Sequence, residues 1–174
     1  MATSALIPVS EYLQTVYEPD CDYVDGEVQE RNLGEEEHSD LQAQLLDLLR
    51  TPANKLLFRA NPELRVQVSA QRFRVPDVCV RRKDAPSERI VRTPPLLCIE
   101  ILSPEDRIAK MRMKIRDYFD MGVPEVWIVD PQSRSVSVCR GVVSVEHSEG
   151  LLTVPETSAT IQLSEIFGVL DEYD

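Results

Sequence analysis

The sequence is poor in the residues that zinc sites, disulfide frameworks and membrane spans require. It contains two histidines, His38 and His147, which argues against a site that needs several imidazole ligands. Its four cysteines form no C-x-x-C pair, and we expect reduced core thiols in a cytoplasmic protein. No run approaches the roughly 18 apolar residues of a membrane span, and residues 1–8 lack the basic start and apolar run of a signal peptide.

The chain carries 174 residues, of which 43% are hydrophobic and 28% are charged, a balance typical of one globular domain over residues 1–174. A net charge of −11 argues against a generic nucleic-acid binder. The charge is unevenly spread, because 12 of the 19 basic residues lie between positions 72 and 116, against six acids. This basic segment surrounds the most unusual acid of the sequence.

That acid is Glu100, inside the run Leu-Leu-Cys-Ile-Glu-Ile-Leu at positions 96–102. The run is apolar apart from the carboxylate and is followed by Ser103-Pro104, a pattern that predicts a central strand buried on both faces. A lone buried carboxylate costs several kcal/mol unless it is paired or bound to a cation. An ion pair with arginine or lysine and a metal site are both compatible with this position.

The remaining patterns predict a mixed sheet with helices. Helical spacing and stop signals predict helices over 11–16, 35–50, 104–121 and 163–170. Alternating or continuous apolar runs predict a hairpin over 23–28, two short strands within 55–68, a strand over 73–80 interrupted at Pro76-Asp77, a strand over 125–129, a hairpin over 135–147 and an edge strand over 151–154. A strand, a crossover helix and a parallel strand over 96–129 indicate an α/β fold with a mixed sheet.

Asp77 and Glu100 lie on adjacent predicted strands, each in an apolar context. Two carboxylates brought together in a sheet repel each other unless a cation neutralises them. Mg²⁺, or Mn²⁺ in its place, fits such a pair because it takes oxygen ligands and keeps several waters. The backbone carbonyl of Ile101 would add another oxygen.

Arg107, Lys110 and Lys114 form a basic stripe on the following predicted helix. A lysine there would stabilise charge that develops on a phosphate, although such stripes are more commonly solvated surfaces.

Taken together, these residues resemble a known family. Pro76-Asp77 followed by Glu100-Ile101-Leu102 resembles the PD-(D/E)XK nuclease signature, with Leu102 at the lysine position. More narrowly, the chain resembles the Uma-two type of restriction endonuclease. The stretches that carry this resemblance are Tyr-Val-Asp-Gly-Glu at 23–27, Glu37-His38, Val-Pro-Asp-Val at 75–78, Ile-Glu-Ile-Leu-Ser-Pro at 99–104, and Lys114 with Gly-Val-Pro-Glu-Val-Trp-Ile-Val-Asp-Pro at 122–131.

The resemblance implies a restriction-endonuclease-like core. It implies Asp77 and Glu100 as Mg²⁺ ligands and Lys114 as the charge-stabilising lysine, with Lys110 as the alternative. It also implies Glu37 as an accessory acid near the metal, whereas we expect His38 to pack.

Three hypotheses follow. The first is a Mg²⁺-dependent endonuclease that hydrolyses DNA and acts as a homodimer, since duplex cleavage needs two cuts. The second is a catalytically silent nuclease-fold module that binds nucleic acid or protein, which the net negative charge favours. The third is that Asp77 and Glu100 only form structural ion pairs with Arg74 or Lys114, so that removing a partner would be strongly destabilising.

Overall fold

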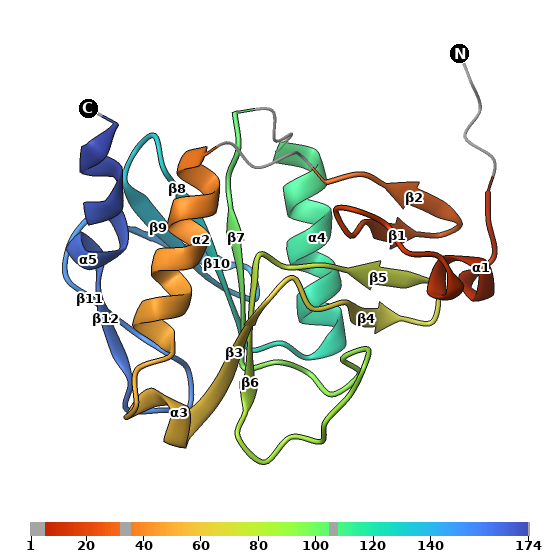
Figure 1. Ribbon diagram of the computed structural model, residues 1–174, viewed down its shortest axis with the longest axis horizontal. Coiled ribbons are helices and arrows are strands. Elements are labelled where there is room, and N and C mark those ends of the chain that lie inside the picture. The colour runs from red at the N-terminus through yellow and green to blue at the C-terminus, as the bar shows by residue number, and fades with distance from the viewer. Residues whose placement is uncertain (1–5, 32–35, 105–107, 174) are drawn as a thin grey trace.

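The computed structural model describes residues 6–31, 36–104 and 108–173. Its centre is a six-stranded mixed sheet with helices on both faces (Figure 1). In spatial order the strands are β10 (Val143–His147), β9 (Ser135–Arg140), β8 (Glu125–Asp130), β7 (Leu97–Ile101), β6 (Val78–Arg82) and β3 (Phe58–Pro62). β7 and β8 are parallel, and the other neighbours are antiparallel.

Two smaller sheets accompany the large one. A four-stranded sheet has the order β2 (Glu27–Gln29), β1 (Asp22–Val24), β5 (Arg72–Arg74) and β4 (Val66–Ser69). A two-stranded sheet pairs β11 (Leu151–Thr153) with β12 (Thr160–Gln162). The helices are α1 (Val9–Gln14), α2 (Glu36–Leu49), α3 (Asn54–Leu57), α4 (Ile108–Met121), α5 (Leu163–Phe167) and the 3₁₀ segment η1 (Gly168–Glu172).

Successive side chains of a strand point to opposite faces of the sheet, so the large sheet contributes to a core on each face. On one face, Ile99 and Ile101 of β7 belong to the core that contains Leu45 of α2 and Ile166 of α5. On the other face, Cys98 of β7 belongs to the core against which α4 packs. All five residues of β7 are buried, as expected of an interior strand covered on both sides.

Several predicted elements are confirmed. β7, α4 and β8 form the predicted crossover with parallel strands. The hairpin β1–β2 turns at Asp25 and Gly26, whose φ angles of 50° and 101° are those that the Asp-Gly pair favours. The β9–β10 hairpin is also confirmed. Two predicted helices begin in or beside segments outside the described residues. Residue 35, the predicted start of the helix over 35–50, is one of these residues. The first turn of the helix over 104–121 also falls there, at residues 105–107, which include Arg107.

Other predictions need correction. The strand expected over 73–80 is two strands, β5 and β6, in different sheets, because Pro76 has no N–H for a ladder and the chain changes sheet at Pro76-Asp77. Residues 55–57, which were predicted as strand, belong to α3. The first helix begins at Val9, ahead of its predicted start at residue 11. β12 was not predicted, although it pairs with the predicted edge strand β11.

All four cysteines are free and buried, as expected of core thiols. Within the described part of the chain, no helix is long and apolar enough to cross a membrane.

Candidate active site

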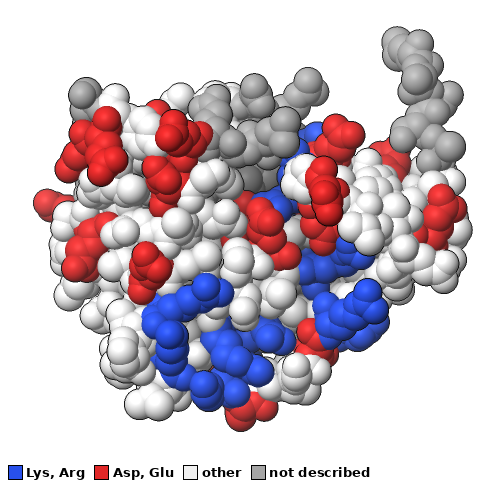
Figure 2. Space-filling view, viewed as in Figure 1, with Lys and Arg blue, Asp and Glu red and all other residues white. Residues whose placement is uncertain are grey.

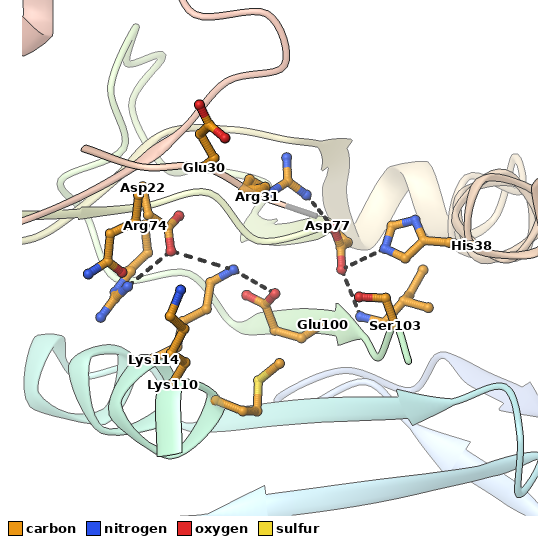
Figure 3. Close-up of a pocket in the computed structure, with 13 residues that line it drawn as sticks. Asp22, Glu30, Arg31, His38, Arg74, Asp77, Glu100, Ser103, Lys110 and Lys114 are labelled. Atoms are coloured by element: carbon orange, nitrogen blue, oxygen red, sulfur yellow. Dashed lines mark hydrogen bonds and ion pairs between the residues drawn. The ribbon is translucent and has the colours of Figure 1, made fainter. Parts of the chain in front are cut away.

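A cavity of about 410 Å³ opens where the large sheet, the four-stranded sheet, α2 and α4 meet (Figure 3). Its polar walls come from segments that are far apart in the sequence. The charged and imidazole side chains that line it are Asp22, Glu30, Arg31, His38, Arg74, Asp77, Glu100, Lys110 and Lys114.

Asp77 lies just before β6, where the chain enters the large sheet. Its Oδ2 accepts a 2.7 Å hydrogen bond from the backbone N–H of Ile101, so the carboxylate continues the ladder between β6 and β7. Arg31 donates to Oδ1, and His38 Nε2 lies 3.4 Å from Oδ2. Burial opposes ionisation of Asp77, but the hydrogen bond from His38 and the positive charges of Arg31 and Lys114 outweigh it and lower the pKa.

Glu100 projects from β7 into the same cavity and meets α4. Lys114 Nζ donates to its Oε2 at 2.7 Å, and the hydroxyl of Tyr118 donates to its Oε1 at 2.6 Å. Burial raises the pKa of Glu100 to about 7, since the nearby charge of Asp77 adds to the burial and the contacts of Lys114 and Tyr118 offset only part of it. The Glu100 anion is therefore less stable here than in water.

Lys114 lies near carboxylates of both sheets. Its Nζ also donates to the carbonyl of Val75 at 3.3 Å and lies 3.8 Å from Asp22 Oδ2. Burial opposes the charged form of Lys114, but the surrounding carboxylates outweigh it and raise the pKa of the ammonium. Lys114 is thus held as a cation between Asp22 of the four-stranded sheet and Glu100 of the large sheet (Figure 3).

A second group of ion pairs, centred on Arg74, stabilises this arrangement. Arg74 is buried and contacts Asp22 at 3.0 Å and Asp117 of α4 at 2.6 Å. The other oxygen of Asp22 accepts the backbone N–H of Val75 at 2.8 Å. These bonds tie β1, β5 and α4 together, and they fix the segment that leads into Pro76-Asp77.

The donor set suits a hard divalent cation in part. Asp77 and Glu100 give carboxylate oxygens from neighbouring strands, and Mg²⁺ commonly binds one or two carboxylates and completes its shell with water and phosphate oxygens. The raised pKa of Glu100 indicates that positive charge at this position would stabilise its anion. Among the described residues, however, no group of three or more His, Cys, Asp or Glu side chains could hold a metal ion.

The structure brings Asp77, Glu100, Ile101 and Lys114 together at one cavity, and Lys110 also lines it. Glu37 does not line this cavity. It is exposed at the start of α2 and lines a neighbouring cavity, which shares His38 and Ser103 with the first one.

Sequence reasoning did not anticipate Arg31, Tyr118 or Asp22, and it assigned His38 to packing. Tyr118 follows Lys114 by one helical turn, so the i, i+4 spacing was a usable signal. Arg31 and Asp22 gave no local signal, because they reach the cavity from the four-stranded sheet or the segment after it. His38 contacts Asp77 from α2.

Comparisons with known proteins give two findings. A profile of the family Uma2, described as "Putative restriction endonuclease", matches residues 9–169. Among solved structures, the chain is similar to the crystal structure of a putative nuclease belonging to DUF820 from Anabaena variabilis ATCC 29413. The TM-score is 0.82 with 23% sequence identity, over 94% of this chain and 99% of that chain. At this identity the likeness establishes a shared fold. A search of curated proteins gave no significant match.

Proposed function

Because this chain belongs to the Uma2 family of putative restriction endonucleases, which supports a nuclease function, we propose that it is a Mg²⁺-dependent endonuclease that hydrolyses DNA phosphodiester bonds. The observation that carries the proposal is the meeting of Asp77, Glu100 and Lys114 at one polar cavity. Two acids and an ammonium group from three separate segments are charges that suit metal-assisted phosphodiester hydrolysis.

Asp77, Glu100 and the carbonyl of Ile101 would hold the metal ion, Mg²⁺ or Mn²⁺. When bound, the ion polarises a phosphate oxygen and lowers the pKa of the attacking water. The chain's own cations would bind the phosphate and stabilise its charge. Lys114 stabilises the negative charge that accumulates on the phosphate oxygens, since its ammonium group lies in the cavity between carboxylates. Arg31 and Lys110, which also line the cavity, supply further positive charge for binding the substrate phosphate.

Asp77→Asn tests the proposal, and its amide oxygen can still accept the N–H of Ile101. Because the change also removes the negative charge that pairs with Arg31, circular dichroism and urea unfolding check that the variant is folded. The variant should cleave supercoiled plasmid at least about a hundredfold more slowly with Mg²⁺, since even residues that only support metal ligands cost 10- to 100-fold when changed. Calorimetric titration with Mn²⁺ should show binding to the wild type and its loss in the variant.

The matched control is Asp47→Asn, which makes the same chemical change at an exposed position of α2. It should cleave and bind metal as the wild type does. Cleavage by Asp77→Asn at the wild-type rate would refute the assignment of the site.

One observation favours a second candidate, the catalytically silent module. Arg31 contacts Asp77, and Lys114 contacts Glu100, so both acids are neutralised by the chain itself. Arg74, one of the partners predicted for them, pairs with Asp22 and Asp117 instead. If the wild type bound no Mn²⁺ and cut no nucleic acid, this candidate would replace the nuclease.

We further propose that the active species is a homodimer in the cytoplasm, since two subunits can cut the two strands of a duplex. Sedimentation of the purified chain with and without DNA would test the assembly.

A further inference from the structure

A second hollow runs along β3 from Asn61 to Phe58 and reaches Lys83, at the end of β6 that is farther from Asp77. It has a volume of about 370 Å³, and four of its lining side chains are cations: Arg50, Lys55, Arg59 and Lys83. None of its lining residues is Asp or Glu. Figure 2 shows blue side chains gathered over this region, which holds α3 and the ends of β3 and β6 in Figure 1.

These four cations lack counter-charges in the described part of the chain, where no carboxylate forms an ion pair with any of them. Arg50 donates to the carbonyl of Ala60 at 2.8 Å, and Arg59 donates to the carbonyls of Ala85 and Arg82. These acceptors are neutral, so both guanidinium charges persist. The Nε atom of Arg59 is buried and has no hydrogen-bond partner among the described residues.

Two acids lie near the hollow, close to the end of β6. Glu156 makes a 2.7 Å ion pair with Arg82, and Asp84 follows Lys83 at an exposed position. Glu156 neutralises Arg82, and neither Glu156 nor Asp84 lines the hollow. In a chain with a net charge of −11, four converging uncompensated cations make a local site for an anion.

The position of the hollow relative to the active site follows from β6. Asp77 immediately precedes β6 and Lys83 immediately follows it, so the two residues are separated by about 20 Å of extended chain. DNA carries one phosphate per roughly 3.4 Å on each strand. Lys83, at the far end of the hollow, therefore lies about six nucleotides from Asp77.

We propose that the far end of this hollow, at Lys83, binds a backbone phosphate of the nucleic acid whose scissile phosphodiester lies in the active-site cavity, about six nucleotides away. The inference rests on the proposed function and adds a requirement to it. Substrates that reach both places are chains longer than about six nucleotides, whereas shorter phosphodiesters gain nothing from the hollow.

The test uses the double variant Lys55→Gln/Lys83→Gln, because both lysines are exposed and their loss leaves the core intact. The control is Arg112→Gln/Arg116→Gln, which removes the same charge from exposed positions of α4. Binding of a fluorescent 20-base-pair duplex is followed by anisotropy in EDTA over a range of salt concentrations. Hydrolysis of bis(p-nitrophenyl) phosphate is measured with Mn²⁺.

We expect the lysine variant to bind the duplex about tenfold more weakly at low salt, with a salt slope less steep by about 0.9, the value for one lost phosphate contact. The control should bind as the wild type does, and both variants should hydrolyse the small phosphodiester at the wild-type rate.

Unchanged duplex affinity and salt slope in the lysine variant would overturn the inference, as would equal weakening in the control. If the duplex were still cut in an Asp77-dependent way, the proposed function would survive that result. A wild type that neither binds nor cuts any nucleic acid would overturn the proposed function itself.

Discussion

The buried pair between Lys114 and Glu100 offers the sharpest prediction about the site. Lys114→Met removes an ammonium group that lies 2.7 Å from a carboxylate whose side chain is 4% exposed. Breaking a buried pair from one side costs about 3–5 kcal/mol, because the remaining charge stays buried and unpaired. Lys110→Met, at an exposed position one turn earlier on α4, should change stability by less than about 0.5 kcal/mol.

A double-mutant cycle separates this pairing from the general effect of the substitutions. The four proteins are the wild type, Glu100→Gln, Lys114→Met and the double variant. Urea unfolding is measured in EDTA at about pH 8, above the Glu100 pKa of about 7. Two charges 4 Å apart at an effective dielectric constant of 20 interact by about 4 kcal/mol, so we expect a coupling energy of about 3 kcal/mol.

A coupling energy below about 1 kcal/mol would refute the pairing and leave Lys110 as the better candidate for the active-site lysine. A large coupling with no loss of cleavage in Lys114→Met would show that the lysine only stabilises the fold.

Two further predictions concern buried charge. Arg74→Met should lower the unfolding free energy by about 3–5 kcal/mol, because it leaves the buried carboxylates of Asp22 and Asp117 without their shared partner; a loss below about 1 kcal/mol in urea unfolding would contradict this. Glu100, whose pKa is raised from 4.5 to about 7 on folding, binds its proton more tightly in the folded state. In the metal-free protein its contribution is therefore fully present below pH 4.5 and is lost as the pH rises through 7, by up to roughly 3 kcal/mol. The difference in stability between wild type and Glu100→Gln should change with pH in that direction, and a constant difference would exclude it.

The sequence predicted the large sheet well because its signals are local. The run at 96–102, the helix after it and the strand that begins at Glu125 each carry their own periodicity and stop signals, and a right-handed crossover joins such elements in one way. The Asp-Gly turn fixed the first hairpin for the same reason. The strand predicted over 73–80 failed, because the apolar pattern on either side of Pro76 does not reveal that the two halves join different sheets.

The sequence alone also singled out Asp77, Glu100 and the lysines of α4, because a carboxylate in an apolar run is costly wherever it lies. Only the tertiary structure decided which cation pairs with each acid. Arg31 reaches Asp77 across 46 positions of the chain, and the hollow beside β3 gathers its cations from α3, from β3 and from the residues that follow α2 and β6. Charge attraction acts through space, so the order of residues determined where the acids lie and the packing of the sheets determined what they face.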